Sequence, residues 1–251
     1  MIGIIVSGGI SFLVVIFSTL IGVNFFKSRN IGQEIQEEVD FHDHKKGTPT
    51  MGGLFIVFGT FVGYALSHIN FWTIGEGFKV EITSMNTNIL LIFGIAFSMA
   101  LVGLLDDFLK VKAGRNLGLK PSQKLILQTL VGLVSAYYFL YLNYDSSFYF
   151  FSGLGFDIGI LKWLVIIFFI IGITNSVNFT DGLDGLVAGS SAISFGGILI
   201  ISFWIYRHPE YYSRFIGQSF LTVDISLLIS AVAGACLGFL WWNTNPAKII
   251  M

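Results

Sequence analysis

Long stretches without a single charged side chain recur along this sequence, and they restrict the folds open to it. A helix needs roughly 20 mostly apolar residues to cross a bilayer. Only 12% of the 251 residues are charged while 54% are hydrophobic, about half the charge of a soluble domain. The sequence therefore predicts an all-α, polytopic membrane helix bundle in one integral-membrane domain, residues 1–251, and excludes a water-soluble globular enzyme. The seven predicted helices cover approximately residues 2–26, 51–75, 82–105, 125–144, 163–180, 185–206 and 225–247.

Lysines and arginines between these stretches predict which way the chain enters the membrane. The first stretch lacks a basic leader region, so we expect a first span rather than a cleaved signal peptide. With the N-terminus outside, ten basic residues fall in inner loops and four in outer loops. The positive-inside rule then places the N-terminus outside and the C-terminus in the cytosol. Aromatic residues predict an outer interfacial belt: Phe71, Trp72, Phe148, Tyr149, Trp204, Tyr206, Tyr211 and Tyr212.

Small residues inside the predicted helices suggest how these helices pack. Glycine lets membrane helices approach closely, so we expect most of the intrahelical glycines at helix contacts. The single Cys236 cannot form an intrachain disulfide and is predicted to be a packing residue. The glycines concerned are Gly94, Gly132, Gly172, Gly196, Gly197, Gly234 and Gly238.

Two adjacent aspartates, Asp106 and Asp107, follow the third apolar stretch in "LLDDFLK". Adjacent helical residues project about 100° apart, so the two carboxylates cannot face one neighbour, whereas Lys110 can reach either of them. One carboxylate could bind or deprotonate a ligand while the other holds a cation. The alternative is a solvated helix end with a local ion pair.

Polar residues repeat every third position in "NSVNFTDGLDG", between the fifth and sixth stretches: Asn175, Asn178, Asp181 and Asp184. The first of them still lies in the membrane, where an asparagine needs a partner. Glycine after each aspartate permits tight turns that could aim both carboxylates at one ligand. Two ordinary Asp-Gly turns are the alternative, and the spacing does not fit a calcium loop.

The stretch "KKGTPTMGG" before the second helix favours an anion. Thr48 can cap this helix with Pro49 at its first position, and Lys45 and Lys46 add positive charge. A bare cap beside positive-inside lysines is the alternative, and the order of a Walker loop is absent. His42 and His44 upstream favour a solvated loop over a metal site.

These polar stretches share the predicted cytosolic face, which combines acids, lysines and an anion-accepting helix start. Acids alone would suggest a cation site and lysines alone an anion site. Together they suit a divalent metal with a phosphate or diphosphate, since Mg²⁺ is usually held by one or two carboxylates plus substrate phosphates.

Five motifs in this order resemble the phospho-N-acetylmuramoyl-pentapeptide transferases of the polyprenyl-phosphate N-acetylhexosamine-1-phosphate transferase superfamily. They are "KKGTPTMGG", "LVGLLDDFLKV", "NLGLKPSQK", "NSVNFTDGLDGL" and "WWNTNPAKIIM". The resemblance implies that UDP-N-acetylmuramoyl-pentapeptide and undecaprenyl phosphate give lipid I and UMP, with Mg²⁺, at the cytosolic face of a bacterial plasma membrane. It implies the lipid bilayer and these two substrates as partners, no nucleic acid, and allows a homodimer.

The resemblance also implies roles for individual residues. In the catalytic group, one aspartate deprotonates the polyprenyl phosphate, and the lysines neutralise phosphate charge. Both a direct displacement and a two-step route through a covalent aspartyl intermediate stay open. The implied catalytic residues are Asp106, Asp107, Lys110 and Lys124; the nucleotide and substrate residues are Lys45, Lys46, Thr50, Asn178, Asp181, Asp184 and Asn243; and the metal ligands are Asp107 and Asp181.

This sequence stops at Met251, the last residue of "PAKIIM". The family pattern continues beyond Met251 with a Gly-Asp-x-Gly-Ser segment and three more helices, and the aspartate of that segment is the family's principal Mg²⁺ ligand. We therefore expect this chain to be C-terminally truncated and inactive as it stands.

Other functions remain as alternatives to this transferase. A transferase for another UDP-N-acetylhexosamine would share the chemistry, and a non-catalytic remnant would keep the motifs without turnover. A cation or proton transporter is the alternative of another class, but transporters place acids near mid-membrane, whereas these acids crowd one face.

Overall fold

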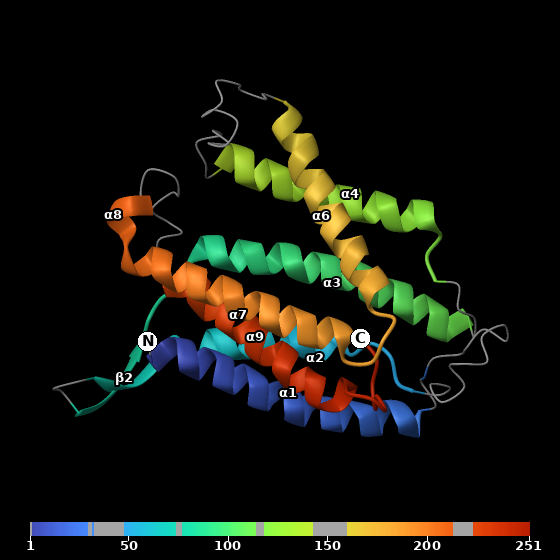
Figure 1. The fold of residues 1–251 in the computed structure, drawn as a ribbon, viewed down its shortest axis with the longest axis horizontal. Helices are drawn as coiled ribbons and strands as arrows, with labels where there is room; N and C mark the ends of the chain where they lie inside the picture. Colours follow the sequence, from blue (N-terminus) through green and yellow to red (C-terminus); the bar gives the residue numbers. More distant parts are fainter. Residues whose placement is uncertain are drawn as a thin grey trace.

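The computed structural model describes residues 2–29, 32, 48–73, 77–113, 118–142, 160–212 and 223–251. The described residues form mainly helices of membrane type, with one β-hairpin (Figure 1). The elements are α1 (Ile2–Ser28), α2 (Gly53–Leu66), β1 (Ile69–Thr73), β2 (Gly77–Ile82), α3 (Thr87–Ala113), α4 (Pro121–Tyr137), the π-helix η2 (Tyr138–Leu142), α6 (Leu161–Thr180), α7 (Leu186–Arg207), α8 (Pro209–Tyr212) and α9 (Val223–Asn243).

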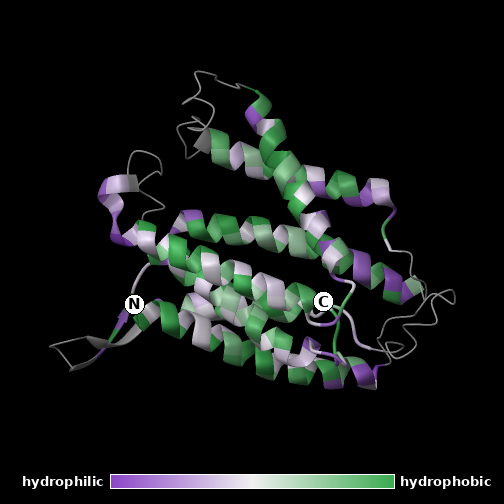
Figure 2. Ribbon diagram, in the orientation of Figure 1, coloured by the Kyte–Doolittle hydropathy of each residue, from purple (hydrophilic) through white to green (hydrophobic). Residues whose placement is uncertain are grey.

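The predicted all-α polytopic membrane bundle is confirmed, with the hairpin as an addition. Within the described residues, α1, α3, α6, α7 and α9 are each long and apolar enough to cross a bilayer, and α2 is a shorter apolar helix. Hydrophobic residues predominate along these helices (Figure 2). Phe168 is 72% exposed and Ile193 is 79% exposed. Such surfaces suit lipid rather than water. The number of spans and the orientation of the termini stay predictions.

Helix α9 lies at the centre of one half of the bundle, packed against α1, α2 and α7. Helices α1 and α9 run parallel and touch at four-residue intervals. Ser230 Oγ donates to the Ile4 carbonyl at 2.7 Å, and Trp242 Nε1 donates to the Ile16 carbonyl at 3.0 Å. Between these bonds, Gly234 faces Gly8. Small residues along one stripe therefore let the two backbones come together.

The glycine prediction is only partly right. A Cβ on Gly234 or Gly238 would collide with the backbone of α1, and one on Gly132 would touch Ile167 of α6. At the other four positions the described residues leave the added atom more than 4 Å of open space, so these glycines do not pack helices together: Gly94, Gly172, Gly196 and Gly197. Cys236 is buried in α9, as expected.

The helix predicted over residues 51–75 is wrong in its second half. Helix α2 ends at Leu66 because two side chains bond to the Tyr64 carbonyl in its last turn: Ser67 Oγ at 2.7 Å and His68 Nδ1 at 2.9 Å. The following residues form β1, which pairs antiparallel with β2, so that Ile69 lies opposite Ile82. This hairpin includes Phe71 and Trp72 of the predicted aromatic belt.

The helix predicted over residues 82–105 is displaced toward the C-terminus. Helix α3 begins at Thr87, where Asn86 Oδ1 accepts from the backbone N–H of Asn88 at 2.9 Å. It continues past Asp106 and Asp107 to Ala113. The aspartates therefore lie within a helix rather than at its end. Lys110, one turn further along, is paired with the charges of both.

Candidate functional site

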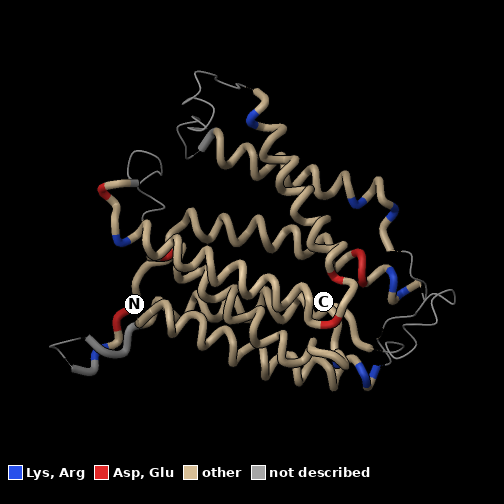
Figure 3. Tube along the Cα trace, viewed as in Figure 1, with Lys and Arg blue, Asp and Glu red and all other residues tan. Residues whose placement is uncertain are grey.

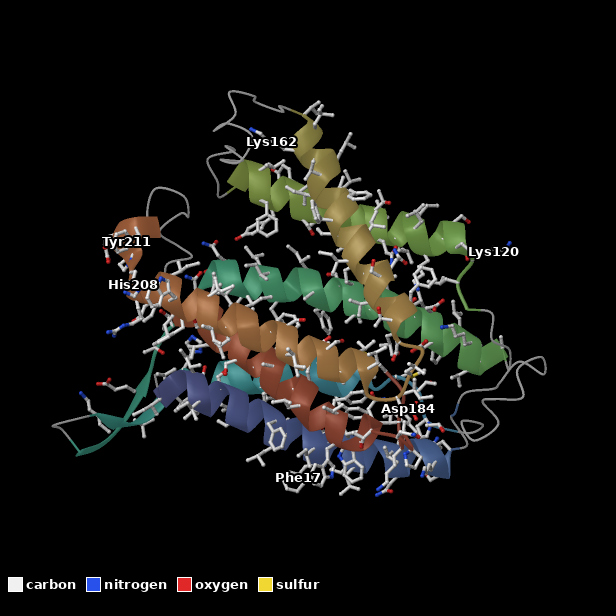
Figure 4. All side chains as sticks on the ribbon, viewed as in Figure 1. Phe17, Lys120, Lys162, Asp184, His208 and Tyr211 are labelled. Atoms are coloured by element: carbon white, nitrogen blue, oxygen red, sulfur yellow. The ribbon has the colours of Figure 1, made fainter. Side chains whose placement is uncertain are left out.

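Charged residues lie at both ends of the bundle, and one of these ends combines the last turns of α3, the start of α4, the turn between α6 and α7, and the C-terminal segment (Figure 3). Asp184 and Lys120 lie toward this end, whereas Lys162 and His208 lie toward the other (Figure 4). The predicted topology requires this separation of Lys120 from Lys162. Which of the two ends faces the cytosol stays a prediction.

The aspartate pair on α3 is bridged by one lysine. Lys110 Nζ lies 2.7 Å from Asp106 Oδ2 and 3.1 Å from Asp107 Oδ1. The other oxygen of Asp106 accepts from the backbone N–H of Leu119 at 2.8 Å. Both oxygens of Asp106 are thus engaged, and its side chain is 11% exposed, whereas that of Asp107 is 25% exposed. The two carboxylates consequently differ, and Asp107 is the one more open to a ligand.

Gly118 belongs to this arrangement, although the sequence did not single it out. A Cβ at this position would collide with Asp106 Oδ1 and would lie 2.7 Å from the Asp106 carbonyl oxygen. Only glycine lets the segment before α4 approach the aspartate closely enough for the Leu119 bond. The sequence feature that could have identified Gly118 is its place in "NLGLKPSQK", the motif that follows the aspartates after one loop.

Two predicted site residues from different helices meet between α4 and α6. Lys124 Nζ donates to Asn178 Oδ1 at 2.7 Å. Lys124 also interacts electrostatically with Asp106 and Asp107. One turn deeper, the amides of Gln128 and Asn175 bond to each other. The structure therefore links the predicted catalytic and nucleotide groups through Lys124, and it adds Gln128, which sequence reasoning missed.

The turn between α6 and α7 is tied to the C-terminal segment. Gly185 has φ +77°, a left-handed conformation that favours glycine. Asn243 Oδ1 accepts from the Gly185 N–H at 3.0 Å, and Asn243 Nδ2 donates to the Ile249 carbonyl at 2.9 Å. Asp184 Oδ2 accepts from the Ala247 N–H at 3.1 Å. Asn243 is 3% exposed. In this structure Asn243 and Asp184 therefore both hold backbone groups in place.

The predicted cap of the second helix is wrong. Helix α2 begins at Gly53 after Gly52, with no side-chain cap bond. The preceding residues instead pair with the C-terminal segment: the Ile250 N–H donates to the Pro49 carbonyl at 2.8 Å, and the Gly52 N–H donates to the Ile250 carbonyl at 3.0 Å. Backbone pairing thus replaces the cap expected from Thr48.

Other predicted residues near α2 have varied outcomes. The Thr50 hydroxyl is buried, and no residue in the described ranges bonds to it. Four predicted residues and the aspartate between the two histidines lie outside the described residues: His42, Asp43, His44, Lys45 and Lys46.

The described acids do not form a complete metal cage. No three histidine, cysteine or acidic side chains of the described ranges lie close enough together to hold a metal ion. Mg²⁺ rarely needs such a cage, because it commonly binds through one or two carboxylates and substrate phosphates. The exposed carboxylate of Asp107 fits that partial role.

Met251 is a packing residue in the structure. It is half-buried and packs against the hydrophobic cluster that α1 and α9 share with Ile249. Its Cγ would lie 3.9 Å from a Cβ added to Gly53, the first residue of α2. A thioether in apolar surroundings fills space rather than holding a hard cation. The ligand expected after Met251 stays a prediction.

Two family models match this sequence. The model of glycosyl transferase family 4 matches residues 89–251, and the first signature of the phospho-N-acetylmuramoyl-pentapeptide-transferases matches residues 45–57. Three similar proteins are phospho-N-acetylmuramoyl-pentapeptide-transferases by name. They come from Corynebacterium efficiens (37% identical, 99% of this chain, 71% of the relative), Corynebacterium diphtheriae (38%, 99% and 71%) and Salinispora arenicola (37%, 99% and 72%).

Proposed function

Because this chain belongs to glycosyl transferase family 4 and, within it, to the phospho-N-acetylmuramoyl-pentapeptide-transferases, we propose that it acts on the substrates which that family name implies. The reaction moves phospho-N-acetylmuramoyl-pentapeptide from its UDP-linked donor to undecaprenyl phosphate and gives lipid I and UMP. It takes place at the cytosolic face of a bacterial plasma membrane, in the membrane stage of peptidoglycan synthesis.

One observation carries the proposal: the contact of Lys124 with Asn178 beside the bridged aspartates of α3. This contact brings two cations, two carboxylates and an amide from three helices to one end of a membrane bundle. A nucleotide from the cytosol and a phosphate on a lipid can both reach such a place. Positioning and charge neutralisation are the main requirements of phosphoryl transfer.

The residues divide the chemistry according to their surroundings. Lys110 and Lys124 neutralise the phosphates, and Asp107 takes the remaining proton of the acceptor phosphate. An oxygen of that phosphate then bonds to the β-phosphorus of the donor, while the bond from this phosphorus to the bridging oxygen breaks and UMP leaves. In a two-step route a carboxylate oxygen first bonds to the β-phosphorus and UMP leaves; an oxygen of the acceptor phosphate then bonds to this phosphorus and the carboxylate is released. The geometry is compatible with both routes. Asp106, with both oxygens engaged, holds Lys110 and the start of α4 in place.

Mg²⁺ would be held by Asp107 and Asp181 together with the donor diphosphate. When bound, the ion would neutralise the charge that develops on the leaving phosphate. Five residues would surround the nucleotide, some of them by holding the nearby backbone in place: Asn178, Asp181, Asp184, Asn243 and Thr50.

UMP release tests the proposal. Membranes containing this chain are supplied with UDP-N-acetylmuramoyl-pentapeptide, undecaprenyl phosphate and Mg²⁺, and nucleotide release is compared with that of an Asp107→Asn variant. We expect any release to fall by about 100-fold or more in the variant, the range for loss of a general acid–base group. The lipid product must carry the mass of the pentapeptide-bearing sugar; a lipid bearing a simpler N-acetylhexosamine would favour the alternative transferase. Equal release by the chain and the variant would contradict the proposal, and so would an absence of release that the C-terminal segment of a relative, joined to this chain, does not restore.

A further inference from the structure

Two pairs of polar side chains join α4 to α6, one above the other. The helices run antiparallel, so that Lys124 meets Asn178 and, one turn deeper into the bundle, Gln128 meets Asn175. The spacing of four residues on α4 matches the spacing of three on α6. A reciprocal arrangement of this kind requires a single alignment of the two helices along their axes.

In the deeper pair Gln128 is buried and Asn175 is half-buried, and the two amides bond to each other. Asn175 Nδ2 donates to Gln128 Oε1 at 2.8 Å, and Gln128 Nε2 donates to Asn175 Oδ1 at 3.5 Å. Asn175 Nδ2 also donates to the Ile171 carbonyl of its own helix at 2.9 Å. Gln128 is 1% exposed. When its partner moves away, an amide buried at a membrane helix interface loses a hydrogen bond, and the free energy of the folded protein rises. The pair therefore resists sliding and rotation of one helix against the other.

Helix α6 depends on α4 for its alignment. Among the described elements α4 is the main packing partner of α6, whereas α6 and α7 make only slight contact. Figure 1 shows α6 lying across α4. Close approach at the crossing is allowed by Gly132, whose added Cβ would lie 3.5 Å from the Ile167 Cα. Few other contacts can correct a displaced α6.

We propose that Gln128 is a positioning residue, which fixes the alignment of α6 on α4 through Asn175 and thereby delivers Asn178 to Lys124. The inference rests on the proposed function, because it assigns Gln128 a role in the same transfer. Gln128 lies one turn deeper than the groups that would meet the substrate and acts only through Asn175. Its effect falls on the binding of the nucleotide donor, since Asn178 and the turn after it move with α6.

Substitutions of matched size test this role. Gln128→Leu and Asn175→Leu keep the volume and remove the amide pair, whereas the exchange Gln128→Asn with Asn175→Gln restores it with the lengths reversed. Thr129→Val is the control, because within the described residues the Thr129 hydroxyl bonds to the Leu125 carbonyl of its own helix and to no other helix. Steady-state UMP release is measured as kcat and KM for the UDP-linked donor.

We expect each leucine variant to raise KM for the donor by about threefold, and by at most about twentyfold, the range for interhelical side-chain hydrogen bonds in membranes. The exchange should recover most of this loss, and Thr129→Val should stay within about twofold of the parent chain. A purely stabilising pair would lower the amount of folded protein and leave KM unchanged. An unchanged KM in both leucine variants, or no recovery in the exchange, would overturn the inference.

A cross-linking measurement reports the alignment without any activity. Gly132→Cys and Ile167→Cys are introduced together, with Cys236→Ala, and the rate of disulfide formation is followed in membranes. Gln128→Leu should slow this rate by about threefold or more, and Thr129→Val should not change it. If UMP release is absent and the C-terminal segment of a relative does not restore it, the proposed function fails, while the cross-linking rate still decides the alignment. An equal rate with and without Gln128 would overturn the positioning role.

Discussion

Gly234 lies where α9 and α1 pack backbone against backbone, and we predict that Gly234→Ala destabilises the bundle. The added Cβ would collide with the Gly8 carbonyl oxygen and would lie 2.8 Å from its carbonyl carbon and 3.0 Å from its Cα. Carbon atoms in ordinary contact are about 3.5–4.0 Å apart, so the helices must separate by roughly 0.5–1 Å. All three atoms belong to backbone, which cannot turn aside as a side chain can.

Separation of the helices would also strain hydrogen bonds on the N-terminal side of Gly234. Ser7 Oγ donates to the Leu227 carbonyl at 2.8 Å, and Ser230 Oγ donates to the Ile4 carbonyl at 2.7 Å. Overpacking in a close-packed core typically costs about 1–3 kcal/mol. At about 2–4 °C per kcal/mol for a chain of this size, the unfolding temperature should fall by roughly 2–12 °C.

The single cysteine supplies the assay. Cys236 is 4% exposed in α9, so a thiol-reactive dye in detergent should label it only when the bundle opens. Gly172→Ala on α6 is the matched control, because the described residues leave open space around its added Cβ and both variants gain the same helix propensity. Equal unfolding temperatures for the two variants would refute the reasoning that close backbone contact holds α1 and α9 together.

Three further predictions concern the site. Lys110→Met should lower UMP release by about 100-fold, because both carboxylates lose their shared cation, while the exposed Lys112→Met should stay near the parent rate; similar rates for the two would contradict the bridge seen in the structure. Gly118→Ala should push the segment before α4 away from Asp106 and lower UMP release by about tenfold or more, and a parent-like rate would show that this close approach is dispensable. Asn243→Ala should destabilise the chain by about 2–4 kcal/mol in the thiol-labelling measurement, since two backbone groups lose their partner; an unchanged unfolding temperature would mean that water replaces the amide.

Much of this protein follows from composition and local pattern. Uncharged stretches of about 20 residues require helices in a bilayer whatever their neighbours are. The order of these helices predicts that the polar motifs share one side of the membrane, and the motifs themselves predict the family. The aspartate pair could be connected with Lys110 because helical spacing brings the three together within one turn.

The tertiary structure decided the features that depend on partners far along the chain. The hairpin after α2 and the extension of α3 beyond Asp107 were both missed, because length and hydropathy locate an apolar segment but not the hydrogen bonds that end it. Gln128 looked ordinary in the sequence, since its partner Asn175 lies 47 positions away. Asn243 was predicted as a nucleotide contact, yet it holds two backbone segments 58 and 6 positions distant. A pattern predicts which residues are polar and buried, whereas only packing determines which polar group each one meets.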